Sequence, residues 1–510
     1  MLKFSIALPD LARDWNYADG RWASGGSWIE PLSHPMLEVR TATDGHGWVM
    51  TVRERQAGVP HTPHAHVTPD ALADEVEIRK AWPLDSVSVH VECDRVSVRA
   101  GHGGSAPLYL AHAGGVLVGS WDLADLKQYA TSDGLVAREV ARLLGGHHRY
   151  GHGTVLPGVS CLTVGSTARF DRGGLTLDYP EPVGEDQPRS LLPGADPVSA
   201  FETLLGHTVG MRPLGDGCAV QLSGGQDSAT VALTVGRNHP GVRAAAMVLP
   251  GAVGEQQADR RACLVAAARL VGDVRVAALA HPPLAMRRIA PDVWSPYDEP
   301  YGEALRALAE RAAHHGVHTM ITGFGGDELM AVRGHRQGRV RDDAWRWLGP
   351  VTLEAAAERD RGIAPQTAVP ETALLAVRTA SPVLLRAGMW PVSPLTDLNV
   401  VRFARWLPDE WHADKRLFRE RLRRCGLPEW VVRPVLRENF TDVMAHSMHV
   451  YGPRLLRQIA ADSPLVEWGF LDPAGLRAVA DACASGPAAA REHTAAYAPI
   501  ALDLFVRALG

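Results

Sequence analysis

Lysine is the residue type that this sequence most conspicuously lacks. The chain has four lysines among its 52 basic residues, and only Lys415 follows residue 127. The net charge of −5 at pH 7 gives no electrostatic basis for binding a nucleic acid or an anionic membrane surface, so we expect neither as a partner. Because arginine has replaced lysine almost everywhere else, Lys415 is a candidate for a selected role.

Cysteine and long apolar segments are also scarce. The six cysteines are scattered and form no Cys-x-x-Cys pair, which favours reduced thiols over a disulfide framework. No segment approaches the roughly 18–20 apolar residues of a membrane span. The first residues lack the apolar core of a signal peptide. We therefore expect a cytoplasmic protein.

The rest of the composition indicates a globular protein with more than one domain. A chain of 510 residues, 46% hydrophobic and 21% charged, is too long for one ordinary core. Alternating segments such as 86–91 and 96–99 predict strands in the first part of the chain. A stretch rich in proline, glycine and acidic residues at 181–188 predicts a linker. We predict domains at 1–188 and 195–510.

After residue 195, strand-like and helix-like segments alternate. We predict strands at 219–222, 244–249, 274–280 and 317–322, and helices at 198–211, 229–237, 259–271 and 303–315. This alternation predicts an α/β fold with a parallel sheet covered by helices on both faces. Ligands of such folds bind at the carboxyl ends of the strands.

The segment Ser-Gly-Gly-Gln-Asp-Ser-Ala at 223–229 is the most informative motif. It follows an apolar run and precedes a predicted helix, whose free N–H groups and dipole attract an anion. The glycines let a phosphate approach the backbone, and the serines add donors. Asp227 would repel bare phosphate, so its carboxylate indicates Mg²⁺. The loop lacks the lysine of a Walker P-loop, which argues against a kinase or GTPase.

A second glycine-rich motif, Gly-Phe-Gly-Gly-Asp-Glu at 323–328, follows a later predicted strand. Both motifs would meet at one edge of the sheet, where Asp327 would be the second Mg²⁺ ligand. Either motif alone also fits a glycine turn at a helix start. The predicted ATP-binding residues are Leu222, Ser223, Gly224, Gly225, Gln226, Asp227, Ser228, Val248 and Gly323.

The two motifs together resemble those of the asparagine synthetase/β-lactam synthetase superfamily. Its members are ATP pyrophosphatases that split ATP between the α- and β-phosphates and leave AMP on an acyl group. The resemblance covers most of the chain and extends to residues 99–126, 156–158, 298–300, 394–397, 415–419 and 437–442. It implies ATP and Mg²⁺ as cofactors. It also implies a degenerate, β-rich, glutaminase-like (Ntn-hydrolase) domain before an ATP-pyrophosphatase (adenine nucleotide α-hydrolase-like) domain with a helical C-terminal part.

The resemblance also implies roles for three further residues. Lys415 matches a lysine that contacts the phosphates, with a solvated helix lysine as the alternative. Arg437 stands where the family has a lysine that supports the charged intermediate. Arginine binds phosphate but does not readily lose a proton, so we expect it to stabilise charge and not to act as an acid or base. Glu299 is the candidate for orienting or deprotonating an attacking amine, with a carboxylate at a helix N-terminus as the alternative.

Three departures from the family pattern narrow the function. Leu2 stands where the glutaminase nucleophile would be, and we interpret Cys93 and Cys161 as buried apolar residues. Phe324, at a position that is Glu or Tyr in relatives, cannot carry a proton. The opening segment 4–10 resembles that of lasso peptide cyclases.

These departures predict a lasso peptide cyclase. Such an enzyme adenylates an Asp or Glu side chain of a leader-cleaved core peptide and closes a macrolactam with the N-terminal amine. A leader-binding protein and a leader peptidase are the implied partners. The alternatives are a β-lactam synthetase-like or ammonia-dependent asparagine synthetase-like ligase acting on a small molecule, and a non-catalytic scaffold that binds nucleotide or peptide.

Overall fold

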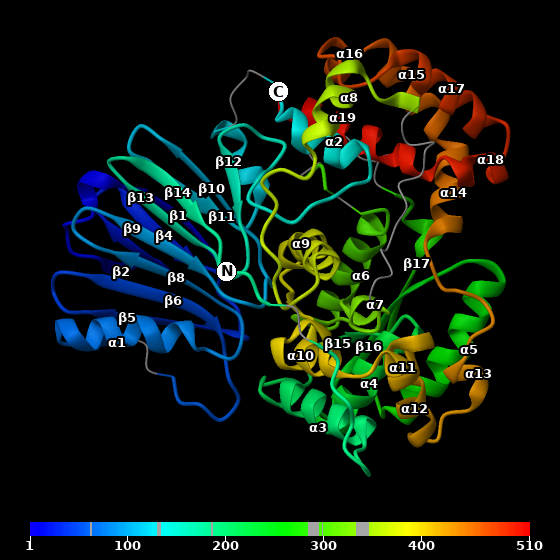
Figure 1. Ribbon diagram of the computed structural model, residues 1–510, viewed down its shortest axis with the longest axis horizontal. Coiled ribbons are helices and arrows are strands. Elements are labelled where there is room, and N and C mark those ends of the chain that lie inside the picture. Colours follow the sequence, from blue (N-terminus) through cyan, green and yellow to red (C-terminus); the bar gives the residue numbers. More distant parts are fainter. Residues whose placement is uncertain are drawn as a thin grey trace.

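Two antiparallel sheets form the N-terminal part of the computed structural model, which describes residues 1–61, 64–129, 134–184, 187–283, 295–297, 299–332 and 346–509 (Figure 1). The first sheet has the strand order β12-β10-β11-β1-β4-β3-β2. Its strands are β1 (Leu2–Ala7), β2 (Asn16–Ala18), β3 (Arg21–Ser24), β4 (Ser27–Pro31), β10 (Leu108–Ala113), β11 (Val116–Ser120) and β12 (Val159–Leu162).

The second sheet has the order β14-β13-β9-β8-β6-β5-β7, and only its edge pair β5–β7 is parallel. Its strands are β5 (Leu37–Thr43), β6 (Trp48–Glu54), β7 (His64–His66), β8 (Ser86–Val91), β9 (Val96–Ala100), β13 (Thr167–Asp171) and β14 (Gly174–Asp178).

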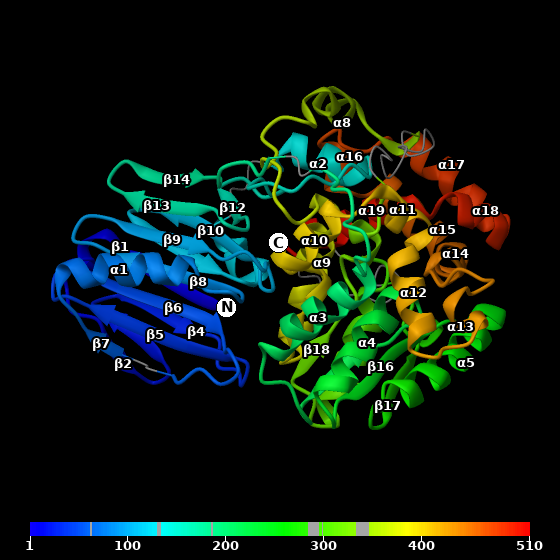
Figure 2. The same cartoon turned by 60° about the horizontal axis from the view of Figure 1, so that its bottom comes forward.

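The two N-terminal sheets share one apolar core. Alternate residues of each strand point inward, so Phe4 and Ile6 of β1 are buried together with Val89 of β8 and Val98 of β9. Helix α1 (Pro69–Lys80) lies along the second sheet (Figures 1 and 2), and its Leu72 packs with Val49 of β6. The alternating sequence pattern of this region is therefore the pattern of a two-layer sandwich.

The two cysteines that the sequence analysis treated as buried behave differently. Cys161 is buried in β12, as expected, but Cys93 is exposed in the turn between β8 and β9. The expectation for Cys93 was wrong because the buried positions of this hairpin end at Val91 and resume at Val96.

The C-terminal part contains a five-stranded parallel sheet with the order β17-β16-β15-β18-β19. Its strands are β15 (Cys218–Gln221), β16 (Arg243–Val248), β17 (Asp273–Ala277), β18 (Thr319–Ile321) and β19 (Trp390–Val392). One face carries α6 (Gly302–His314) and α9 (Glu371–Arg386). The core on the other face includes residues of α3 (Pro197–Gly210), α4 (Gln226–Asn238) and α5 (Gly251–Ala267). The protein thus has the α/β layout that the alternation of segments predicted.

Most of the remaining helices lie in the upper part of Figure 1 and along the lower rim of the parallel-sheet region, whereas α7 lies near its middle, beside α6. They are α2 (Ala137–Leu144), α7 (Gly326–Leu329), α8 (Pro350–Ala355), α10 (Leu398–Trp406), α11 (Asp409–His412), α12 (Arg416–Arg424), α13 (Glu429–Val432), α14 (Thr441–Val450), α15 (Gly452–Ala461), α16 (Pro464–Glu467), α17 (Pro473–Ala484), α18 (Pro487–Glu492) and α19 (Tyr497–Arg507). Within the described part of the chain, no helix combines the length and apolarity needed to cross a membrane.

Buried polar contacts join the sandwich to the parallel-sheet region. Glu54 at the end of β6 accepts hydrogen bonds from Arg212 at 2.9 Å and from Nε1 of Trp390 at 2.7 Å. Farther along the boundary, Nε of Arg386 in α9 donates to Asp122 at 2.8 Å. Of these contacts, the Arg386–Asp122 pair joins the end of α9 to the segment that follows β11.

Candidate functional site

The first glycine-rich motif forms the turn between β15 and α4, at the carboxyl edge of the parallel sheet. Gly224 has a φ of +101°, a conformation that favours glycine. Oγ of Ser223 lies 3.0 Å from Oγ of Ser228, and Nε2 of Gln226 donates to the Val432 carbonyl at 2.7 Å. Helix α4 begins without a side-chain N-cap, so its first N–H groups remain available to an anion.

The second glycine-rich motif packs directly against the first. A Cβ atom at Gly323 would lie 2.9 Å from the backbone nitrogen of Ser228, and one at Gly326 would lie 2.4 Å from Cγ of Asp227. Both positions therefore exclude any larger side chain without a shift of the loops. These glycines let Asp327 approach Asp227 from a neighbouring strand, as the two-loop prediction requires.

Lys415 lies between the two aspartates. Its Nζ is 2.6 and 2.7 Å from the carboxylate oxygens of Asp227 and 2.6 Å from Oδ1 of Asp327. Lys415 has a left-handed φ of +50° directly before α12, and Asp414 has one of +53°. Two consecutive non-glycine residues in this conformation are unusual and cost conformational energy. The backbone is thus strained at the point that delivers the ammonium group.

The electrostatics of this cluster are those of a partly buried site. Burial raises the pKa of Asp227 to about 6, although the Lys415 ammonium opposes the shift, and the nearby charges of Asp327 and Glu328 add to it. Burial would lower the pKa of Lys415, but the two carboxylates together outweigh it and raise that pKa. The side chain of Asp327 is 75% exposed against 19% for Asp227, so the cluster opens to solvent on the Asp327 side.

The donor set fits a hard divalent cation. Asp227 and Asp327 converge on one point that a positive group already occupies, and carboxylate oxygens are preferred ligands of Mg²⁺. Across the described residues, no group of three or more His, Cys, Asp and Glu side chains has the geometry of a complete metal site. A Mg²⁺ ion held here would therefore need further oxygen ligands, which phosphates and water supply.

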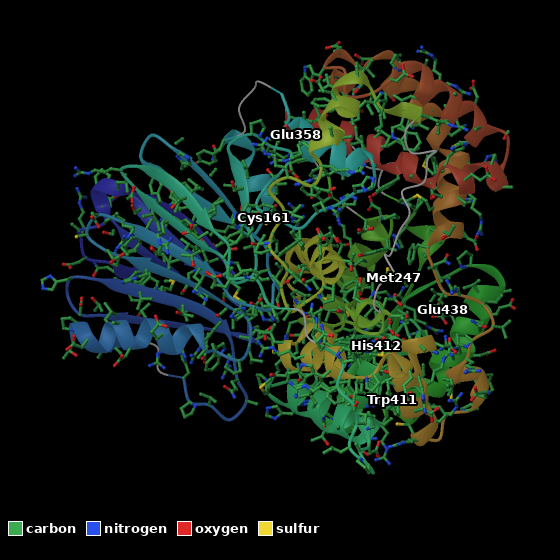
Figure 3. The ribbon with its side chains drawn as sticks, viewed as in Figure 1. Cys161, Met247, Glu358, Trp411, His412 and Glu438 are labelled. Carbon is green, nitrogen blue, oxygen red and sulfur yellow. The ribbon has the colours of Figure 1, made fainter. Side chains whose placement is uncertain are left out.

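Arg437 and Glu438 lie in the segment between α13 and α14. Arg437 is exposed. Glu438, labelled in Figure 3, faces the first loop: a Cβ on Gly224 would lie 3.0 Å from its Oε1. Arg260 of α5 holds Oε1 of Glu438 at 2.7 Å. The sequence analysis missed Glu438 and Arg260, although Glu438 lies within the matching segment 437–442.

The other predicted residues lie in different surroundings. Leu222 is buried under the first loop, where Arg261 donates to its carbonyl at 2.6 Å. Val248 ends β16, at the same edge of the sheet as the loops. Phe324 packs, partly buried, against the core of α6 and α9. Glu299 is half-buried before α6 and lines a cavity of about 1120 Å³. Its motif partner Asp298 lies outside the described residues.

The structure is that of an α/β protein in which two glycine-rich loops and the cluster of Asp227, Asp327 and Lys415 lie at the carboxyl edge of the parallel sheet. A profile of the asparagine synthase family matches residues 200–507, and the chain belongs to that family. Family membership supports an ATP-dependent ligase that forms C–N bonds and releases AMP and pyrophosphate, and ATP is used in this family typically with Mg²⁺.

The remaining comparisons add little. No curated protein matches the chain. Among solved structures, the glutamine phosphoribosylpyrophosphate amidotransferase from B. subtilis complexed with ADP and GMP is 10% identical, with 70% of this chain and 79% of that chain covered and a TM-score of 0.20. A structure of the allosteric regulatory enzyme of purine biosynthesis is also 10% identical, covering 70% and 80%, with a TM-score of 0.21. Likenesses this low carry no argument.

Proposed function

We propose that this protein is an ATP-dependent, AMP-forming lasso peptide cyclase. In the first step, an oxygen of an Asp or Glu side-chain carboxylate of the core peptide attacks the α-phosphorus of ATP, and pyrophosphate leaves. In the second step, the N-terminal amine of the peptide attacks the acyl carbon, loses a proton, and expels AMP as the amide bond closes the ring. The observation that carries the ATP chemistry is the contact of Lys415 with both Asp227 and Asp327 beside the first loop.

Each of these residues has a defined task in the proposal. The N–H groups of the first loop and of the start of α4 bind phosphate oxygens. Lys415 and Arg437 neutralise the charge that builds on the leaving pyrophosphate. Asp227 and Asp327 would hold Mg²⁺, which screens the phosphate charges when bound. Glu299 lies where an acceptor in the adjacent cavity can reach it, and we assign it to orienting or deprotonating the amine.

The N-terminal sandwich supports a reaction that does not use glutamine-derived ammonia. We interpret it as a degenerate glutaminase-like domain. Leu2 is a fully buried apolar residue of β1, and burial raises the pKa of the nearby Cys161 thiol, which keeps it protonated at neutral pH. Neither side chain provides a nucleophile, so we expect the amine to be free ammonia or to come from the acceptor itself. A peptide amine meets that requirement; the leader-binding protein and the leader peptidase would supply such a peptide.

The alternatives are a β-lactam synthetase-like or ammonia-dependent asparagine synthetase-like ligase on a small molecule, and a scaffold without catalysis. The size of the cavity beside Glu299, about 1120 Å³, exceeds the roughly 300–1,000 Å³ of typical small-molecule sites and favours a peptide. Phe324, partly buried against the core of α6 and α9, offers no proton carrier to a small-molecule reaction. The strained Lys415 argues against a scaffold, because strain without function has no evident reason to persist.

One assay separates the three functions. Pyrophosphate release from ATP is measured with candidate core peptides, with aspartate plus ammonium, and without an acceptor. Turnover with a peptide that bears a free N-terminus and an Asp or Glu supports the cyclase, and an N-acetylated copy of that peptide should yield no cyclic product. Turnover with aspartate plus ammonium alone would favour the small-molecule ligase. No pyrophosphate release under any of the three conditions would favour the non-catalytic scaffold.

A further inference from the structure

A large cavity lies along one side of α9. It has a volume of about 1120 Å³. Its walls come from the loop after α2, the segment before α6, one side of α9 and the start of α19. Glu371, Leu375 and Arg378 of α9 all line it, as residues spaced by four and three on one helix face do. The cavity is therefore bounded by both parts of the molecule.

Two arginines in this cavity differ in their surroundings. Arg149 lies 2.7 Å from Oδ1 of Asp360 and 3.7 Å from Oε2 of Glu371. Arg378 is half-buried, yet it forms no ion pair with any residue that the structure describes. Arg149 is thus charge-compensated by its neighbours, whereas Arg378 has no carboxylate partner in the part of the chain that the structure describes.

The neighbours of Arg378 are aromatic and neutral. Its guanidinium lies 5.4 Å from the ring centroid of Tyr150 and 5.8 Å from that of Tyr297, and Cys161 adjoins it. The phenol oxygen of Tyr150 accepts from the Val164 N–H at 3.0 Å, and that of Tyr297 accepts from the Val155 N–H at 2.8 Å. Burial raises the pKa of both tyrosines and of the Cys161 thiol. None of these groups carries a negative charge at neutral pH.

Arg378 also stands between two hollows. It lines the large cavity and a second, small one of about 30 Å³ beneath β1, which has room for about one or two water molecules. In Figure 3, Cys161 marks the edge of the N-terminal sheets that faces α9. Only the large cavity has space for a ligand group, so a ligand would reach the guanidinium from that side.

We infer that Arg378 is the anchor of a carboxylate-binding subsite in this cavity. An uncompensated guanidinium in partly buried surroundings is costly, and an anion that arrives with the ligand removes that cost. The planar guanidinium suits a carboxylate because it can donate two parallel hydrogen bonds. Tyr297, which also lines the large cavity, adds a flat apolar wall next to the charge, whereas Tyr150 lines the small cavity on the other side.

The identity of the ligand rests on the proposed function. The acceptor of that reaction is a peptide, and its carboxylate could be the C-terminal one or a side-chain one that is not activated. Both present the same chemistry to Arg378. Holding one fixed carboxylate would restrict how the peptide lies while its amine closes the ring, which is a positioning effect.

Binding of trifluoroacetate, followed by fluorine NMR, tests the subsite without any turnover. We expect saturable binding to the wild-type protein that acetate displaces. Arg378→Gln should weaken it at least tenfold, and Arg378→Lys should weaken it less because the charge remains. Arg149→Gln is the matched control, since it removes a paired cation from the same cavity, and it should leave the affinity unchanged.

The results that overturn the assignment are equally definite. They are no saturable binding to the wild type, equal binding to Arg378→Gln, or an equal loss in Arg149→Gln. Thermal unfolding checks that each variant folds. If Arg378→Gln does not fold, the titrations of the wild type and of Arg378→Lys provide the test. An affinity of Arg378→Lys equal to that of the wild type would then contradict the bidentate geometry.

Competition then distinguishes the sources of the carboxylate. The competitor is an octapeptide of glycine and alanine with one aspartate, used as the free acid, as the C-terminal amide, and with asparagine replacing the aspartate. Loss of competition on amidation identifies the terminal carboxylate, and loss with asparagine identifies the side chain. Competition by none of the three would contradict a peptide ligand. If no peptide stimulates pyrophosphate release but trifluoroacetate still binds saturably, the proposed reaction is refuted and the carboxylate-binding subsite remains supported.

Discussion

The N-terminal sandwich and the C-terminal parallel-sheet region differ in the residues at the positions where the family resemblance implies a site. At the carboxyl edge of the parallel sheet, Lys415, Asp227 and Asp327 meet within 2.7 Å, on glycine loops and a strained turn. In the sandwich, the position expected for a glutaminase nucleophile is occupied by the fully buried Leu2, and the nearby thiol of Cys161 is also buried. Partly buried charges and backbone strain are costly, whereas apolar packing is not. Under the proposed function, we therefore expect catalysis to depend on the parallel-sheet region and not on the sandwich.

The largest effect that this contrast predicts is that of Asp227→Asn. Loss of one carboxylate from the cation site should reduce pyrophosphate release by about 10³-fold, equivalent to about 4 kcal/mol of transition-state stabilisation. The exposed Asp171 in the sandwich provides the control, and Asp171→Asn should keep full activity. Wild-type turnover in Asp227→Asn, with an unchanged unfolding temperature, would remove the metal assignment.

Lys415→Met should have the next largest effect. The ammonium group offsets charge on the leaving pyrophosphate, so its loss should lower kcat by about 10²- to 10³-fold. Lysine is rare enough in this chain for a close control: Lys127, whose Nζ donates to the Ala508 carbonyl at 3.2 Å, lies in the segment after β11. Steady-state pyrophosphate release should fall only in the first variant. Equal losses in both would show that lysine removal acts through stability.

The affinity for Mg²⁺–ATP should depend on pH through Asp227, and this effect should be smaller than those of the substitutions above. With the pKa of Asp227 raised to about 6 from 3.8, affinity for Mg²⁺–ATP should fall about tenfold between pH 7 and pH 5 as the carboxylate gains a proton. Folding stability should respond with the opposite sign. A raised carboxylate pKa contributes stability that is present below pH 3.8 and is lost as the pH rises through about 6.

Nucleotide titration and thermal unfolding across this range would measure both responses. Asp227→Asn should abolish the pH step in nucleotide affinity. A step that persists in this variant would assign the titration to another group.

The smallest functional effect should come from Leu2→Cys in the sandwich. The substitution places a thiol where glutaminase-like relatives have their nucleophile, but the surroundings are those of an apolar core. We expect no ammonia release from glutamine and an unchanged rate of pyrophosphate release. Removing buried methyl groups should lower the free energy of unfolding by about 1–3 kcal/mol. Ammonia production by this variant would show that the sandwich retains a working glutaminase site.

Much of the parallel-sheet region could be predicted from the sequence. Four of its five strands overlap predicted segments, three of them starting one residue early, and α3, α4 and α6 begin within three residues of the predicted positions. Helix α5 begins at Gly251, eight residues earlier than predicted, because a glycine start after Pro250 lacks the usual capping side chain. Strand β19 was missed, since its three residues include Pro391 and show no alternation.

The candidate site was predictable in its residues but not in its contacts. The motif positions identified Asp227, Asp327 and Lys415 from residue chemistry and family resemblance. Nothing in the sequence indicated that Lys415 itself bridges the carboxylates, because that contact depends on the left-handed turn before α12. Arg378 was not anticipated either. It is one of many arginines, and only the fold reveals that it has no ion-pair partner among the described residues.

The central claim is that two aspartates on neighbouring loops and one lysine hold a magnesium-bound nucleotide. A crystal structure with Mg²⁺ and α,β-methylene ATP tests it most directly. The account predicts the triphosphate on residues 223–228, a Mg²⁺ ion on both Asp227 and Asp327, and the ammonium of Lys415 moved from the carboxylates to the phosphates. A nucleotide bound elsewhere, or a Lys415 that still bridges the two carboxylates beside a bound triphosphate, would contradict it.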